Sequence, residues 1–435
     1  MPPTIFPTGV TIYDPDKAYN CFVSFDGRDG HAYLIDMNGN DTKVWSYCGM
    51  PAEIIDPALI DGQRGHALLQ GERHSFGNET LMELDWDENV VWHWGAKAPG
   101  GTVKQSHDVA RLSNGNTLVL SRLPHRVPAI SDDPIMDQAF YEVTQDGDIA
   151  WQWLSSDHID EFGLSPEQRM LLLSDTMRPR RTGLLALNNM SPLGPNKWFD
   201  SGDQRFNPDN IMTCSRDGNF VAIIAKSTGE VVWQMGPHYP GAYDFSKKSF
   251  IGDVPRPVDS ISGQHDAHLI PKGLPGEGNI LIFDNQGTGG FPPVYLELFQ
   301  GSRVVEVDPL TKEIVWQYDG LASGSQFWTF MSYHMSNARR LPNGNTLICE
   351  GDFGRLFQVT ADGEIVWEYV NPNFVSEIEP GFTGKPSAFS SIFMADRNWI
   401  YRAQPVPYDW VPEDTQRSEI PVIPPKIQSY RVIGI

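Results

Sequence analysis

A short phrase, an apolar run closed by tryptophan, occurs six times along the chain. The copies are Val44-Trp45, Val91-Trp92, Ile149-Ala150-Trp151, Val231-Val232-Trp233, Ile314-Val315-Trp316 and Ile365-Val366-Trp367. In five of them another large side chain follows two residues later, as expected of a strand whose alternate residues face one packed layer. Repetition at roughly 40–50 residues, with four short strands per unit, is typical of propeller blades. The sequence therefore predicts an all-β, six-bladed β-propeller.

A second repeated phrase supplies the strands that open a blade. Residues 106–112 lead through an Asn-Gly-Asn turn into the apolar run 117–120, and residues 336–341 lead in the same way into 346–348. Looser copies begin at Asp209 and at His265. Asn-Gly and Asp-Gly turns between apolar runs favour tight hairpins, because both central residues of such a turn take positive φ. Each blade is therefore expected to consist of two hairpins, the second of which ends in tryptophan.

The spacing of the repeats predicts one domain over residues 1–435, because repeat architectures use such a length for a single closed body. Two intervals between successive tryptophans are longer than the others, which predicts long inserted loops at about 155–205 and 236–262. Residues 165–173 resemble a short capped helix, so short helices are expected in the insertions. Long loops on a rigid scaffold commonly form lids and binding walls, and we expect these to cover a central funnel on one face.

The two ends of the chain are expected to complete the ring. We assign residues 8–36 to strands of the first blade, whereas the tail at 373–435 lacks another full blade phrase. The tail is expected to wrap the outside and close the ring, because closure leaves no exposed sheet edge.

Composition limits the partners. The chain has 33 Lys and Arg against 55 Asp and Glu, which gives a formal charge of -22 and argues against nucleic acid and anionic membrane surfaces. The start of the sequence lacks the basic and apolar segments of a secretory signal, and no apolar stretch is long enough to span a bilayer. A cytoplasmic protein is expected, or a periplasmic one if a signal was removed; the oligomeric state stays open. The four cysteines have no Cys-x-x-Cys spacing, so buried free thiols are expected.

Three histidines fall near the start of predicted innermost strands. Aligning the Asn-Gly-Asn turns puts four polar residues in register: His107, Asn210, His265 and Ser336. Strand alternation directs His334 the same way as Ser336. Because innermost strands line the axis of a propeller, these side chains are expected to converge on one mouth of the channel. His268 and the aspartates that follow His107 and His265 are expected to face the opposite way.

Two arginines near these strands, Arg122 and Arg303, are candidates for binding an anionic oxygen, because guanidinium presents a fixed fork of donors. The alternative for each is a salt bridge at the surface. Imidazoles beside arginine suit transfer of a sulfuryl, phosphoryl or acyl group, elimination from an anionic substrate, or a metal site. No His-x-His or His-x-x-x-His spacing supports a metal, and no cofactor is predicted.

Several of these stretches together resemble the bacterial arylsulfate sulfotransferase (ASST-like) family. The matching stretches are residues 7–14, 32–39, 263–267, 302–318, 340–348 and 362–369. The resemblance implies a six-bladed propeller that moves a sulfuryl group from a phenolic sulfate ester to another phenol or to water, without a nucleotide sulfate donor. It also implies a transiently sulfated histidine, with further histidines and an arginine around the transferring oxygens. His265 carries over most clearly, His334 and His107 follow by register, and the choice of nucleophile stays open.

The chain also departs from the pattern of that family. Gln286-Gly287-Thr288 stands where an arginine is expected, with Arg303 as a more distant substitute, and Ser336 occupies a position where histidine is displaced to 334. Two further hypotheses therefore remain. One is a hydrolase or lyase that acts on a small aromatic or sugar-derived anion by histidine acid–base chemistry, and the other is a propeller that only binds a ligand or protein.

Overall fold

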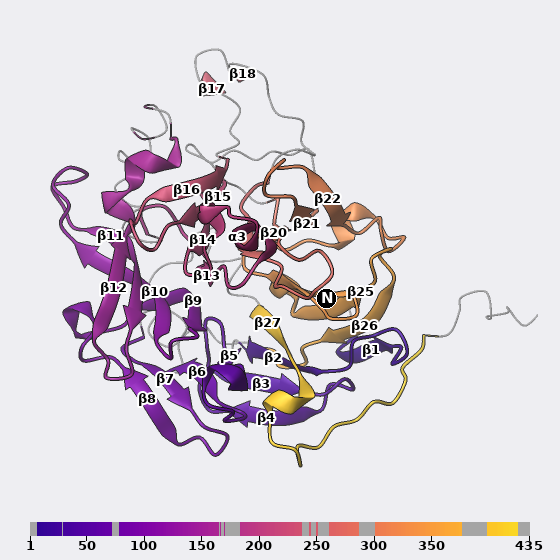
Figure 1. Cartoon of the computed structure of the whole chain (residues 1–435). Helices are drawn as coiled ribbons and strands as arrows, with labels where there is room; N and C mark the ends of the chain where they lie inside the picture. The colour runs from indigo at the N-terminus through magenta and orange to yellow at the C-terminus, as the bar shows by residue number, and fades with distance from the viewer. Residues whose placement is uncertain are drawn as a thin grey trace, which may run out of the picture.

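The computed structural model describes residues 7–27, 29–71, 78–164, 166, 169, 183–236, 243–244, 249–250, 261–286, 301–375 and 398–424. Six sheets of four or five antiparallel strands lie around a central axis (Figure 1). The predicted all-β, six-bladed β-propeller is confirmed. No helix within these ranges is long and apolar enough to cross a membrane.

The first three blades contain four strands each, named from the axis outward. Blade 1 consists of β27 (Ile400–Val406), β2 (Phe22–Gly27), β3 (Ala32–Ile35) and β4 (Asp41–Trp45). Blade 2 consists of β5 (Glu53–Ile54), β6 (Ala67–Gln70), β7 (Leu81–Leu84) and β8 (Val90–Trp94). Blade 3 consists of β9 (Gln105–Arg111), β10 (Thr117–His125), β11 (Ile135–Val143) and β12 (Ile149–Leu154).

The second half of the ring has the same plan. Blade 4 consists of β13 (Ser191–Pro192), β14 (Ile211–Ser215), β15 (Phe220–Ile224) and β16 (Val231–Met235). Blade 5 consists of β19 (His265–Leu269), β20 (Ile280–Asp284), β21 (Arg303–Val307) and β22 (Ile314–Tyr318). Blade 6 consists of β23 (Asn337–Arg340), β24 (Thr346–Glu350), β25 (Arg355–Val359), β26 (Ile365–Val370) and β1 (Gly9–Tyr13).

Short elements occupy the connections. Helix α3 (Lys197–Asp200) lies in the predicted insertion at 155–205, and the side chain of Asn196 caps it. Strands β17 (Tyr243–Asp244) and β18 (Ser249–Phe250) pair within the predicted insertion at 236–262. The helix predicted at 165–173 lies outside the described residues except for residues 166 and 169. The described 3-10 turns are η1 (Pro57–Leu59), η2 (Pro99–Gly101), η3 (Ser155–Asp157), η4 (Ile159–Phe162), η5 (Gln204–Phe206), η7 (Phe327–Thr329), η8 (Gly351–Phe353) and η9 (Tyr408–Trp410).

The ring closes at both ends of the chain, but not in the expected way. Within the tail, β27 forms the innermost strand of blade 1, next to β2 (Figure 1). The expectation that the tail at 373–435 wraps the outside is wrong for this segment. β1 joins the outer edge of blade 6 by pairing with β26, so residues 9–13 do not belong to the first blade as expected. A backbone bridge between Tyr13 and Val422 then ties the two ends of the chain together.

Carboxamide side chains bridge every junction between neighbouring blades. Each donates a hydrogen bond to backbone of the adjacent blade or of the segment that leads into it, and some also accept one. In ring order from the junction of blades 1 and 2 these residues are Gln404, Gln105, Gln138, Asn189, Asn285 and Asn337. Buried backbone groups must be paired, and a carboxamide can satisfy an N–H and a C=O at once. These residues tie each blade to the next around the ring.

The repeated tryptophan joins blades at the outer side of the ring. Trp233 donates its indole N–H to the carbonyl of Pro309 at 2.8 Å, in the turn between the third and fourth strands of blade 5. Trp367 donates in the same way to Met37 of blade 1 at 2.8 Å, and Trp316 of blade 5 donates to the corresponding turn of blade 6. In these three blades the repeated tryptophan makes the same contact with the next blade, whereas the buried Nε1 atoms of Trp45 and Trp92 have no hydrogen-bond partner within the described residues.

Replacing Trp367 with phenylalanine should lower the free energy of unfolding by about 1–3 kcal/mol, because the carbonyl of Met37 would lose its buried partner and a small void would form. Trp367 is fully buried, whereas Trp316 is partly exposed. Trp316→Phe is therefore the matched control and should lower the free energy of unfolding by a smaller amount. Urea unfolding of the two variants measures both effects, and equal losses would contradict this account.

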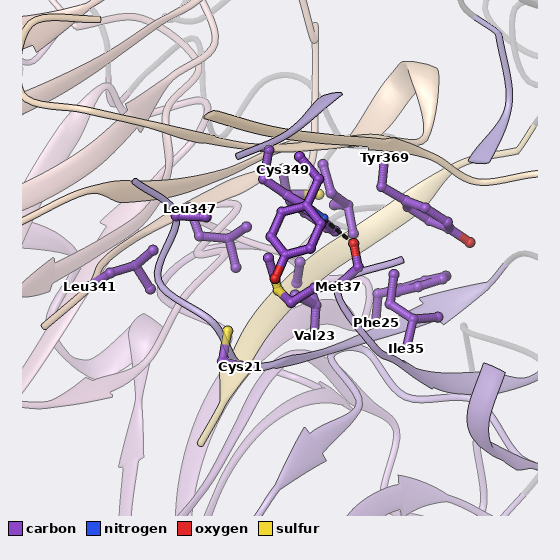
Figure 2. Packing of buried hydrophobic residues seen from close by; sticks show 14 of the residues in the cluster. Cys21, Val23, Phe25, Ile35, Met37, Leu341, Leu347, Cys349 and Tyr369 are labelled. Atoms are coloured by element: carbon purple, nitrogen blue, oxygen red, sulfur yellow. Dashed lines mark hydrogen bonds between the residues drawn. The ribbon is translucent and has the colours of Figure 1, made fainter. Parts of the chain in front are cut away.

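The apolar core lies between blades. Figure 2 shows the layer that joins the first and last blades, where Val23, Phe25 and Ile35 of blade 1 pack with Leu347 and Tyr369 of blade 6. Burial of such side chains contributes about 25 cal/mol per Å² of apolar surface. All four cysteines are buried and form no disulfide, which confirms the prediction of buried thiols.

Candidate active site

An arginine on the C-terminal strand occupies the centre of the ring. Arg402 of β27 in blade 1 lies 3.0 Å from Asp108 Oδ2 in blade 3 and 3.4 Å from Asp266 Oδ1 in blade 5. It also donates to the carbonyl of Asn188 at 2.8 Å. Blades 1, 3 and 5 are not neighbours, so these side chains meet at the axis. Burial works to lower the pKa of Arg402, but the carboxylates outweigh it and raise this pKa, so the group stays charged.

A second guanidinium completes the network. Arg339 of blade 6 donates to both carboxylate oxygens of Asp266, one of these bonds measuring 2.9 Å, and approaches His268 Nδ1 at 3.1 Å. Burial works to raise the pKa of Asp266, but Arg339 and Arg402 hold it below its ordinary value. Burial and the charge of Arg339 lower the pKa of His268 to about 4.

The innermost strands are bulged where their polar residues begin. Non-glycine residues have positive φ there: His107 at 70°, Asp266 at 57° and Ser336 at 81°. The pairing of β9 with β10 and of β19 with β20 shifts register in the same region. A bulge interrupts strict alternation, so successive residues no longer face opposite sides. The expectation that Asp108 and Asp266 face away from the ring is therefore wrong.

His107 lies on β9 against the side chain of Tyr401. The two rings are 6.0 Å apart in an edge-to-face arrangement, and the Tyr401 hydroxyl donates to the carbonyl of His107 at 3.0 Å. Ser106 Oγ is 2.5 Å from His107 Nδ1. Burial, followed by the charges of Arg122 and Arg402, lowers the pKa of His107 to about 3. The imidazole is therefore neutral at physiological pH.

His265, at the start of β19, is buried, and both of its ring nitrogens form hydrogen bonds. Its Nδ1–H donates to Asn285 Oδ1 at 2.7 Å, and its Nε2 accepts from the backbone N–H of Met335 at 3.2 Å. These partners define the neutral tautomer with the proton on Nδ1. Burial, followed by the charge of Arg216, holds the pKa of His265 well below its ordinary value.

His334 forms a pair with a carboxylate. Its Nδ1 lies 2.8 Å from Asp352 Oδ1, and Asp352 Oδ2 accepts from the backbone N–H of Tyr333 at 2.7 Å. The imidazole is 20% exposed, whereas the carboxylate is 5% exposed. A carboxylate at Nδ1 fixes the orientation of the ring and favours the tautomer whose lone pair is on Nε2.

A small apolar cluster lies between these histidines. Met335 and Tyr401 pack together with Met50 and Trp399. Trp399 contacts the edge of His334 with ring centroids 5.6 Å apart, and Tyr401 contacts His107. Met335 also supplies the N–H that binds His265. The three predicted histidines therefore surround one cluster at the start of the innermost strands.

The predicted arginines lie in different environments. Arg122, within β10 and opposite Gln138 of β11, is near enough to His107 to lower its pKa. Arg303 lies on the third strand of blade 5, where its fully buried Nε donates to Asp284 Oδ2 at 2.8 Å. A guanidinium enclosed with its own carboxylate is a poor binder of substrate, so the structure gives Arg303 a role in the interior of the blade instead.

Asn210 and Ser336 are also placed differently from the prediction. Asn210 precedes β14, the second strand of blade 4, and its side chain binds Arg205 O at 3.0 Å and Lys226 N at 3.2 Å. Ser336 is fully buried, donates to Ser332 Oγ at 2.8 Å and accepts from a backbone N–H of η8. Ser336 therefore supports the loop that carries His334, and Asn210 supports a turn.

Sequence reasoning missed several residues of this region. Arg216 follows β14 and lowers the pKa of both His107 and His265, although its sequence context indicates only a hairpin turn. Tyr401 and Arg402 fall in the stretch that the sequence predicts as an outer tail. The strand-like run at 399–402 is the signal that could have found these two. Within the described ranges, no group of three or more His, Cys, Asp or Glu side chains is placed to hold a metal ion.

Replacing His107 with glutamine should flatten the dependence of stability on acid pH. The folded-state pKa of His107, about 3, lies below the unfolded value of about 6.5. Between these values the unfolded chain binds a proton that the folded chain does not, so the free energy of unfolding decreases as pH falls through this window. The slope should change by at most about 1.4 kcal/mol per pH unit in the variant.

Denaturant unfolding of both proteins between pH 4 and 7 measures this slope. The carboxyl of Glu53, whose pKa burial raises to about 8, acts in the opposite direction, since its stabilising contribution is lost as pH rises. Its effect cancels in the difference between the two proteins. Identical slopes would show that the pKa of His107 is the same in the folded and the unfolded chain.

Comparison with known proteins gives one sequence family and several solved structures of low sequence identity. The profile of the family described as Arylsulfotransferase (ASST) matches residues 64–372, most of the chain. No curated protein matches the sequence. A solved protein of unknown function from Bacteroides caccae aligns over 89% of this chain and 99% of its own, with 12% identity and a TM-score of 0.47. The Dos1 propeller aligns over 85% and 74% with 8% identity (TM-score 0.37), and virginiamycin B lyase from Staphylococcus aureus over 84% and 85% with 10% identity (TM-score 0.36).

Proposed function

The chain belongs to the arylsulfotransferase (ASST) family, and from this premise we propose that it moves a sulfuryl group from a phenolic sulfate ester to a second phenol or to water through His334. The observation that carries this proposal is the His334–Asp352 pair beside the imidazoles of His107 and His265, whose pKa values burial lowers. The substrate is then a small aromatic anion, and no nucleotide sulfate donor takes part.

The choice of nucleophile follows from the positive charge that develops on the attacking imidazole ring. A bond between a neutral imidazole nitrogen and sulfur leaves positive charge on the imidazole, which an adjacent carboxylate stabilises. The Asp352 carboxylate is in contact with His334 Nδ1, whereas Nδ1 of His265 faces the uncharged carboxamide oxygen of Asn285. The pKa of His107, about 3, makes it a weakly basic and weakly nucleophilic ring. These differences favour His334 as the residue that accepts the sulfuryl group.

The reaction proceeds in two displacements. The Nε2 lone pair of His334 attacks sulfur, the bond from sulfur to the phenolic oxygen breaks, and the phenolate leaves. The acceptor oxygen then attacks the same sulfur, and the bond between nitrogen and sulfur breaks. The proton lost by the acceptor hydroxyl balances the one gained by the departing phenolate. The charges of Arg122 and Arg216 act on the His107 ring, and we assign to these two arginines the positive charge that stabilises the sulfuryl oxygens. His107 offers a neutral ring that does not compete for a proton.

Mass spectrometry of protein quenched in acid-free buffer after mixing with 4-nitrophenyl sulfate tests the proposal. A labile increase of one sulfuryl group should map to the peptide that contains His334 and should disappear when phenol is added. His158 provides a matched control, because it forms a similar pair with Glu161 at 2.6 Å and is 19% exposed. Absence of any adduct while turnover proceeds would exclude a histidine intermediate.

A further inference from the structure

The last strand that the structure describes, β27, contacts the backbone or the neighbouring carboxylate of two site histidines. Tyr401 holds the carbonyl of His107 through its hydroxyl at 3.0 Å. The next residue, Arg402, lies between Asp108 and Asp266, which directly follow His107 and His265 in the sequence. The side chain of Arg402 is only 3% exposed. Two adjacent residues of β27 therefore reach both His-Asp pairs.

The local backbone needs such support. His107 and Asp266 both have positive φ, a conformation that non-glycine residues adopt at a cost in free energy. Such conformations persist where surrounding contacts over-determine them. The carboxylate of Asp108 accepts the backbone N–H of Met190 at 2.8 Å, but within the described residues its only ion-pair partner is Arg402. Loss of Arg402 would leave this buried carboxylate without a counter-charge and would free the bulge beside His107.

We propose that Tyr401 and Arg402 are positioning residues, through which the C-terminal strand holds His107 and His265 in the geometry that sulfuryl transfer requires. The inference rests on the proposed function for its catalytic consequence, but the positioning itself can be measured without substrate. On this account the site acquires its working geometry only when β27 occupies the innermost position of blade 1. Neither residue touches the reacting atoms.

The variants separate positioning from stability. Arg402→Met removes the charge and keeps much of the side-chain volume. Arg402→Met combined with Asp108→Asn also removes the stranded carboxylate, while Asp266 keeps its bonds to Arg339. Arg340→Met is the matched control, because Arg340 forms a buried inter-blade pair with Glu306 at 2.7 Å and makes no contact with the histidines in the described structure.

The first measurement is the ¹⁵N NMR spectrum of the imidazoles in the full-length protein without substrate, assigned with His107→Gln. In the parent protein and in Arg340→Met, the His107 and His265 rings should remain neutral in a single tautomer between pH 5 and 8. In the two proteins that carry Arg402→Met, their signals should shift or broaden. Unchanged signals would overturn the inference whether or not the protein transfers sulfuryl groups.

The second measurement is steady-state transfer from 4-nitrophenyl sulfate to phenol. Arg402→Met should lower kcat by about 100-fold with a much smaller change in KM, because small misplacement of site groups has effects of this size. The double variant should regain most of the melting temperature of the parent but not its kcat. Recovery of both would show that Arg402 contributes only to stability. A parent protein without transfer activity would refute the proposed function, and the spectra would still decide the positioning role.

Discussion

Substituting alanine for His334 should reduce sulfuryl transfer by about 10⁴–10⁶-fold, because the group that receives the sulfuryl moiety would be absent. The side chain is partly exposed and lies in a loop, so the fold should be retained. Initial rates with 4-nitrophenyl sulfate and phenol measure the loss, and circular dichroism checks the fold. The residual rate should show no adduct on the protein.

His158→Ala serves as the control for this variant, since His158 has a similar carboxylate pair but stacks on Trp153 with ring centroids 5.1 Å apart. Its rate should equal that of the parent protein. Full turnover in His334→Ala would remove this residue from the mechanism. An adduct that moved to the peptide containing His107 would transfer the nucleophilic role to that residue.

Arg303→Met should lower the free energy of unfolding by about 3–5 kcal/mol. Arg303 and Asp284 are both fully buried and are joined at 2.8 Å, so the variant would leave an uncompensated carboxylate in the interior of blade 5. Guanidinium chloride unfolding measures the loss directly. The same variant should retain its KM for the aryl sulfate, because the guanidinium is enclosed within the blade.

Lys17→Met is the comparison for that experiment, because Lys17 makes an exposed pair with Glu364 and its side chain is 48% exposed. Exposed pairs contribute little, so the unfolding midpoint of this variant should stay close to that of the parent. Equal losses of unfolding free energy in the two variants would show that breaking the buried Arg303 pair costs no more than breaking an exposed pair. A large increase in KM for Arg303→Met would restore a role in substrate binding.

The blade count could be predicted from the sequence because the same residue pattern closes each blade, and at three junctions it makes the same hydrogen bond to the next blade. The indole N–H of Trp233, Trp316 and Trp367 must reach the next blade, so the same residue returns at the same place in the repeat. The register of the histidines was also readable, since Asn-Gly turns mark the end of the innermost strand. Patterns that serve every blade leave a signal in a single sequence.

Features that occur only once left no such signal. The innermost strand of blade 4 is the two-residue β13, reached from within a predicted insertion, so the alignment of turns points to Asn210 on the approach to the following strand instead. The bulges at His107 and Asp266 break the alternation from which the directions of the aspartates are derived. The role of Arg402 cannot be predicted from the tail sequence, because its contacts are with blades 3 and 5, which are far away in sequence.

The ring is closed by two terminal strands, β1 in blade 6 and β27 in blade 1, and this constrains how the protein can open. Strand β1 is held at the rim of blade 6 and strand β27 at the axis of blade 1, so neither strand can detach without opening the apolar layer between these blades. Release of either strand would therefore expose the apolar layer between blades 1 and 6, so local opening at the two terminal strands and opening of the ring disrupt the same contacts.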